Sequence, residues 1–134
     1  MSRSDARKSA FYLLYQYDFI APEEKEANME LYFAEHPQLQ EADRAFVKER
    51  LEGTLSHLEE IDAALSAHAK GWSLGRMNKV DLAILRLAVY EMQYASDVPV
   101  GVAINEAVEL AKEFSSEKAP SFINGVLGAI TPRS

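Results

Sequence analysis

Residues 78–94 constrain the fold of this chain most strongly, because they predict a helix that is apolar on nearly every side. Asn78 suits the N-cap position, and Asp81 follows three residues later, as in a capping box. A helix without a polar face is typical of the centre of a domain, so other elements must surround it. Arg86 and Glu91 are then partly buried and need partners. We expect Glu91 to be structural, as a hydrogen-bond acceptor at a neighbouring helix N-terminus.

The remainder of the chain also predicts helices, and no sustained period-2 alternation indicates a strand. Apolar residues recur at helical spacing in five further segments, which are residues 4–19, 24–35, 41–70, 99–112 and 120–130. Gly53 or residues 56–60 can kink or divide the third of these. We therefore predict an all-α single domain of about six to seven helices, with an N-terminal half over residues 1–70 and a C-terminal half over residues 71–134.

The composition excludes several classes of protein. The 134 residues contain no cysteine, which rules out disulfides, thiolate metal sites and cysteine nucleophiles. We find no signal peptide and no apolar run of about 18 residues, so we expect a cytoplasmic protein that does not cross a membrane. The three histidines form no zinc motif, and the serines and glycines form no nucleophile elbow or phosphate loop. We therefore expect a binding module without enzymatic activity, metal or cofactor.

Charge is distributed unevenly along the chain. The net charge is −7, and residues 21–62 carry twelve acidic residues against four basic ones. The first predicted helix begins instead with Arg3, Arg7 and Lys8. Lys8 is followed at helical spacing by Tyr12, Tyr15 and Phe19. This face is either a solvated helix start, or a set of phosphate contacts beside aromatic rings that stack on bases.

The C-terminal segment, residues 97–130, predicts two short helices joined by a polar turn. Pro99 and Pro120 each suit a first helical turn, where the missing N–H group costs nothing. Gly125 inside the second helix costs about 1 kcal/mol relative to alanine, so we expect close helix packing at that position. Asn105 or Glu106 is expected to tie helix ends together.

Several unusual segments, taken in order, resemble the transcription antitermination factor NusB family over nearly the whole chain. The matching residues are Ala6-Arg7, Leu14-Tyr15, Val80-Asp81, residues 84–91, Asp97-Val98-Pro99, residues 102–112 and residues 122–127. The resemblance implies a non-catalytic helical fold of two bundle-like halves. It also implies a protein that pairs with NusE, a ribosomal small-subunit protein, binds single-stranded boxA RNA in rRNA leaders, and joins RNA polymerase with NusA and NusG.

The resemblance also implies where RNA binds. By the family pattern, the RNA surface combines the start of the first helix with the turn before the last one. The residues carried over as RNA-binding are Arg3, Arg7, Lys8, Tyr15, Lys118 and Phe122. Arg3, Arg7 and Lys8 would contact phosphates, whereas Tyr15 or Phe122 would stack on a base. Asp81 would bind a partner, cap a helix, or do both.

One departure from the family pattern affects the expected affinity. Ser4 and Asp5 stand where the family often carries bases, which predicts weak RNA binding by this chain alone and strong dependence on NusE. Two alternatives remain open at this stage. The chain could be a helical adaptor that binds only proteins, and the aromatic face of the first helix could serve a second subunit in a homodimer instead of RNA.

Overall fold

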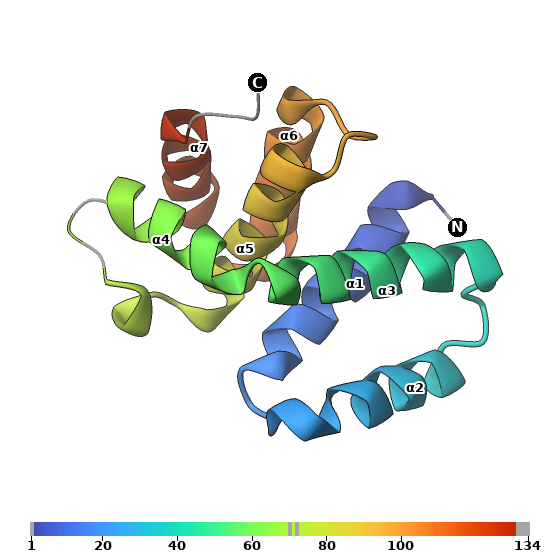
Figure 1. The fold of residues 1–134 in the computed structure, drawn as a ribbon. Helices are drawn as coiled ribbons and strands as arrows, with labels where there is room; N and C mark the ends of the chain where they lie inside the picture. Colours follow the sequence, from blue (N-terminus) through green and yellow to red (C-terminus); the bar gives the residue numbers. More distant parts are fainter. Residues whose placement is uncertain (1, 70, 72, 131–134) are drawn as a thin grey trace.

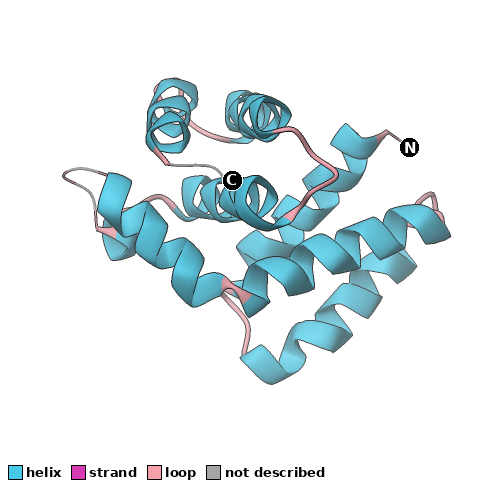
Figure 2. Ribbon diagram, turned by 45° about the horizontal axis from the view of Figure 1, so that its top comes forward, coloured by secondary structure: helices cyan, strands magenta, loops and turns pink. Residues whose placement is uncertain are grey.

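The computed structural model describes residues 2–69, 71 and 73–130, and this part of the chain contains helices and no strand (Figure 2). The all-α prediction is therefore confirmed. The elements in chain order are α1 (Arg3–Tyr17), η1 (Pro22–Glu24), α2 (Lys25–Glu35), α3 (Glu41–Ser56), α4 (Leu58–His68), η2 (Leu74–Arg76), α5 (Lys79–Tyr94), α6 (Val100–Phe114) and α7 (Ala119–Ala129), where η marks a short 3-10 helix.

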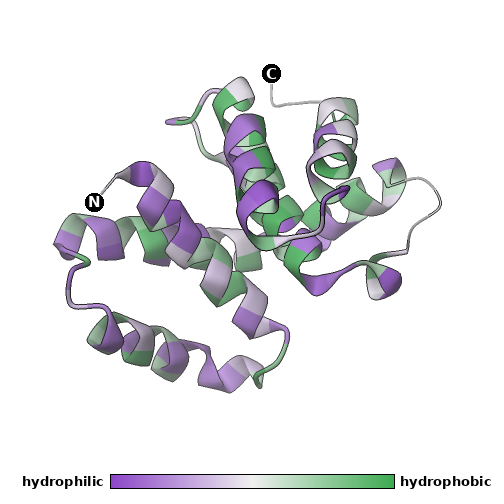
Figure 3. Cartoon of the chain, turned by 180° about the vertical axis from the view of Figure 1, so that it is seen from behind, coloured by the Kyte–Doolittle hydropathy of each residue, from purple (hydrophilic) through white to green (hydrophobic). Residues whose placement is uncertain are grey.

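Helix α5 is the centre of the fold, as its apolar sequence predicts. It packs against α1 and α3 on one side and against α4, α6 and α7 on the other (Figure 1). Its apolar side chains are among the most completely buried in the described chain, and they include Leu82, Ile84, Leu85, Leu87 and Met92. The surrounding helices alternate hydrophobic and hydrophilic residues along their length (Figure 3). Such alternation gives each helix one side that packs on the core.

Helix α4 belongs to the predicted N-terminal half, residues 1–70, yet it packs on α5 and α7 of the C-terminal half. It also contacts α3, next to His57, where α3 ends and α4 begins. The boundary between the two halves stays a prediction. The predicted long helix over residues 41–70 is divided at His57, within the interval proposed for a break, and Lys70 lies outside the described residues.

Gly53 remains inside α3 and does not kink it. A Cβ atom built at this glycine would lie 2.3 Å from the hydroxyl oxygen of Tyr90 and 2.4 Å from its ring. Tyr90 is only 6% exposed, and its hydroxyl donates a hydrogen bond to Glu49. Gly53 therefore provides the space in which the Tyr90 ring of α5 packs against α3.

Gly125 does not have the close-packing role that its sequence position suggested, and that prediction is wrong. The residue is exposed, and a Cβ atom added there would meet nothing within 4 Å. The reason is the orientation of α7, whose buried side is formed by other residues, namely Ala119, Ile123, Val126 and Leu127.

The helix ends largely follow the predicted capping chemistry. The Asn78 side chain caps α5 by accepting hydrogen bonds from the backbone N–H groups of Val80 at 2.7 Å and Asp81 at 3.3 Å. Pro120 lies in the first turn of α7. Pro99 is the N-cap residue of α6, one position before the predicted first turn.

Among the described residues, we find no helix with the length and apolar character needed to cross a membrane.

Candidate nucleic-acid interface

A buried ion network anchors the N-terminal end of α1 to the rest of the fold. The Glu91 carboxylate, which is 0% exposed, accepts hydrogen bonds from Nε and Nη2 of Arg7, both at 2.9 Å. It also accepts one from Nε of Arg50 at 2.9 Å. These charge-assisted bonds join α1, α3 and α5. The predicted structural role of Glu91 is thus supported, although its partners are arginine side chains and not a helix N-terminus.

Further acids surround the two arginines. Glu106 of α6 accepts a hydrogen bond from Arg7 at 2.8 Å and another from the Ser4 hydroxyl, so it ties α6 to the start of α1. Arg50 contacts Glu49 and also Asp97, the latter at 3.3 Å. Burial alone would lower the pKa of Arg50, but the hydrogen bond to Glu49 and the charge of Glu91 raise it. Arg50 therefore stays cationic within this network.

Arg7 is poorly placed for the phosphate contact that the family resemblance suggests. It is only 4% exposed, and its guanidinium group is committed to Glu91 and Glu106. An approaching phosphate would have to displace two carboxylates from a buried site, which is costly. We therefore interpret Arg7 as a residue that positions α1, and the interface proposed below does not include it.

Arg3 and Lys8 lie at the surface, but each is already engaged. The Arg3 guanidinium lies 4.3 Å from the centre of the Phe46 ring. The Lys8 ammonium lies 3.0 Å from a Glu113 carboxylate oxygen. The hydrogen bond to Glu113 and its negative charge raise the pKa of Lys8. Cations paired in this way attract phosphates less than free ones do, which gives a structural basis for the predicted weak RNA binding by this chain alone.

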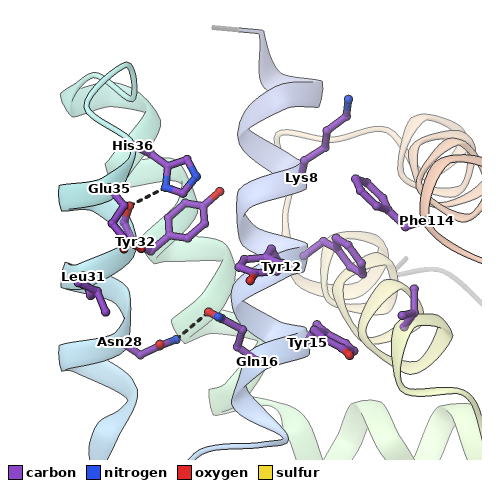
Figure 4. Close-up of a pocket in the computed structure, with 12 residues that line it drawn as sticks. Lys8, Tyr12, Tyr15, Gln16, Asn28, Leu31, Tyr32, Glu35, His36 and Phe114 are labelled. Atoms are coloured by element: carbon purple, nitrogen blue, oxygen red, sulfur yellow. Dashed lines mark hydrogen bonds between the residues drawn. The ribbon is translucent and has the colours of Figure 1, made fainter.

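An aromatic trough of about 570 Å³ lies over the outer face of α1 (Figure 4). We call it the α1 trough. Tyr12 and Tyr15 of α1 lie along its middle. One wall belongs to α2, and the other is formed by Val80 of α5 and Phe114 of α6. Lys8 lies towards the N-terminal end of α1 (Figure 4), so the structure places two of the predicted RNA-binding residues, Lys8 and Tyr15, in one surface depression.

A second depression of about 420 Å³ lies at the turn between α6 and α7, and we call it the turn pocket. The structure brings together here three predicted residues from different parts of the chain: Asp81, Lys118 and Phe122. Lys118 is exposed, whereas Asp81 is 8% exposed and accepts a hydrogen bond from the Ser115 hydroxyl. Asp81 therefore ties the start of α5 to the end of α6, and this bond takes the place of the expected capping box.

Neighbouring residues of α5 line the two depressions. Val80 lines the α1 trough, while Asp81 lines the turn pocket. The two depressions hold the half-buried rings of Tyr15 and Phe122, each beside a lysine. Aromatic rings and lysines at a surface are groups that bind single-stranded nucleic acid.

The α2 wall of the α1 trough contains none of the residues predicted from the sequence to bind RNA. The rings of Tyr32 and His36 stack there with centroids 3.9 Å apart and an angle of 16° between their planes. Tyr32 and His36 stand four residues apart at the end of the helix predicted over residues 24–35, and this spacing was a usable signal, since residues four apart on a helix share a face. In the described residues, no group of three or more histidine, aspartate or glutamate side chains is placed to hold a metal ion.

Comparison with known proteins gives a consistent result. The model of the NusB family matches residues 4–132. The transcription antitermination protein NusB of Acetivibrio thermocellus is 46% identical over 131 residues, which cover 97% of this chain and 88% of that protein. The solved structure of NusB from T. maritima has a TM-score of 0.87 at 32% identity, and the match covers 96% of this chain and 89% of the T. maritima chain.

A second solved structure is a complex that contains RNA. It holds the antitermination factors NusB and NusE with double-stranded RNA, and the matching chain has a TM-score of 0.82 at 30% identity. The match covers 95% of this chain and 93% of that one. The family model spans nearly all of the sequence. The Acetivibrio thermocellus protein is well above 30% identical to this chain, over nearly the whole length of the chain. This chain therefore belongs to the NusB family.

Proposed function

We propose that this chain is a transcription antitermination factor that binds boxA-type single-stranded RNA in rRNA leader transcripts together with NusE. Family membership supports the antitermination role, and the similar NusB–NusE–RNA complex supports both partners. One structural observation carries the RNA assignment. The α1 trough and the turn pocket, built from segments about a hundred residues apart, are lined by the neighbouring residues Val80 and Asp81 of α5.

The two kinds of contact on this surface have different roles. Lys118 and Lys8 lie where they can meet phosphates, which contributes affinity without reading sequence. Tyr15 and Phe122 offer rings for unstacked bases, and Asp81 can accept hydrogen bonds from base amino groups at the edge of the turn pocket. The hydrogen bonds to base amino groups, unlike the stacking, distinguish boxA from other RNA.

NusE supplies the positive charge that this chain lacks. A basic ribosomal protein suits an acidic chain of net charge −7 through electrostatic complementarity. Since Lys8 and Arg3 are already engaged by Glu113 and Phe46, much of the phosphate attraction must come from the partner. The complex then joins RNA polymerase with NusA and NusG, and no step requires catalysis by this chain.

A titration of fluorescent boxA RNA tests the proposal. We expect weak binding by this chain alone, and at least about ten-fold tighter binding when NusE is present. The affinity should fall steeply with salt, because released counterions accompany each phosphate contact. Equally weak binding of boxA and of scrambled RNA, with or without NusE, would refute the proposal and favour the helical adaptor that binds only proteins.

Reversing the charge of Lys118 tests the turn pocket separately. In Lys118→Glu we expect boxA RNA affinity in the presence of NusE to fall about ten-fold, with a shallower dependence on salt. Lys48→Glu is the matched control, because Lys48 is also exposed but lies on α3. Equal losses in both variants would show a general effect of net charge and not a contact at the turn. Arg7→Glu is unsuitable for this purpose, since it would disrupt the buried network.

A further inference from the structure

The α1 trough extends beyond the predicted RNA-binding residues towards α2. Tyr12 is 43% exposed, and its ring centroid lies 5.8 Å from that of Tyr32. Tyr32 in turn stacks on His36, so three rings from two helices line this end. Figure 4 shows Tyr12 on the side of α1 that faces the α2 wall. Rings gathered in this way at a surface can receive further rings by stacking.

The base of this end of the trough carries two amide side chains, and Glu35 of α2 adds a carboxylate to its lining. The Asn28 side-chain amide of α2 donates a hydrogen bond to the side-chain carbonyl oxygen of Gln16 in α1, at 3.0 Å (Figure 4). Each amide group has more donor and acceptor capacity than this bond uses. The Tyr32 hydroxyl donates to Ser9 at 2.8 Å, which fixes the ring in place. The site thus offers ordered rings and amide groups, the combination that binds bases.

Two observations favour nucleotides as the occupant. The α2 end is continuous with the proposed RNA surface, because Lys8, Tyr12 and Tyr15 belong to the same trough. The trough volume of about 570 Å³ also suits inserted rings, since ligand pockets are typically of this size.

We propose that nucleotides flanking boxA continue along the α1 trough, where their bases stack on Tyr12 and on the Tyr32–His36 pair without sequence preference. This inference rests on the proposed function, because boxA must first be held at Tyr15 and the turn pocket. It assigns α2 to the RNA interface and predicts a binding site longer than boxA itself. Stacking of this kind tolerates any base, because every base presents a flat ring.

RNA length provides the test, measured with the full chain and NusE by fluorescence anisotropy. The RNAs compared are boxA alone, boxA extended by four adenosines at one end or at the other, and boxA extended at the same ends by four abasic units. We expect one adenosine extension to tighten binding at least about five-fold, as one stacked base would. The abasic extension should add little, because it supplies phosphates without rings. Tyr12→Ala should remove the gain, measured as the ratio of the affinities of this variant for extended boxA and for boxA alone.

Leu31→Ala is the matched control, because Leu31 is 58% exposed on the same α2 wall but has no aromatic ring. It should retain the gain from the adenosine extension. The inference is overturned if Tyr12→Ala keeps the full gain, or if abasic and adenosine extensions tighten binding equally. It is also overturned if sedimentation shows a dimer that Tyr12→Ala dissociates, which would assign the trough to a second copy. Failure of boxA alone to bind would instead refute the proposed function.

Discussion

Glu91→Gln is expected to lower the free energy of unfolding by about 3 kcal/mol. Glutamine has nearly the same shape as glutamate, but it cannot balance the charges of Arg7 and Arg50, which are 4% and 3% exposed. Breaking a buried ion pair typically costs about 3–5 kcal/mol. We expect the lower end, since Glu106 still contacts Arg7 and Glu49 still contacts Arg50. Urea unfolding followed by circular dichroism measures the change.

Glu109→Gln provides the matched control for this change. Glu109 also pairs with a cation, Lys112 at 3.5 Å, but both side chains are more than half exposed. An exposed pair of this kind contributes between 0 and about 1 kcal/mol, so the control should unfold almost like the parent protein. If Glu91→Gln also unfolds within 1 kcal/mol of the parent, the buried network does not hold α1 in place.

The fold could be predicted from the sequence because local patterns determine most of it. The apolar character of α5 placed it at the centre, and Asn78 marked its first turn. The partners of buried charges could not be predicted in the same way. Arg7 and Glu91 are 84 residues apart in the chain, and only the packing of α1 on α5 brings them together. Arg7 therefore looked like a surface base in the sequence, although it lies in the interior.

In the candidate nucleic-acid interface too, individual residues could be predicted from the sequence, but contacts between distant helices could not. Tyr15, Lys118 and Phe122 could be named from the family resemblance, and the structure places them in two depressions that neighbouring residues of α5 line. The sequence could not show that Glu113 pairs with Lys8, since that contact depends on how α6 lies beside α1. It also could not place α2 next to α1, so the Tyr32–His36 wall was missed.

Gly53→Leu is expected to lower the free energy of unfolding by about 3 kcal/mol, for a reason that follows from packing alone. The new side chain would occupy the space of the Tyr90 ring, which already approaches the Cβ position to 2.4 Å. Tyr90 cannot move easily, because it is buried and its ring stacks near Tyr94, with centroids 5.8 Å apart. The gain in helix propensity from replacing glycine is under about 1 kcal/mol and cannot offset this cost.

Gly125→Leu makes the identical change at a helical glycine with open space around it. Here we expect a free energy of unfolding that is unchanged or raised by up to about 1 kcal/mol, because only the helix propensity changes. Urea unfolding of both variants under the same conditions measures the contrast. The two glycines cannot be distinguished by helix position alone, since both lie within helices. If Gly125→Leu proved the more damaging of the two, α7 would have to pack against something at that face, and the close contact at Gly53 would not limit stability.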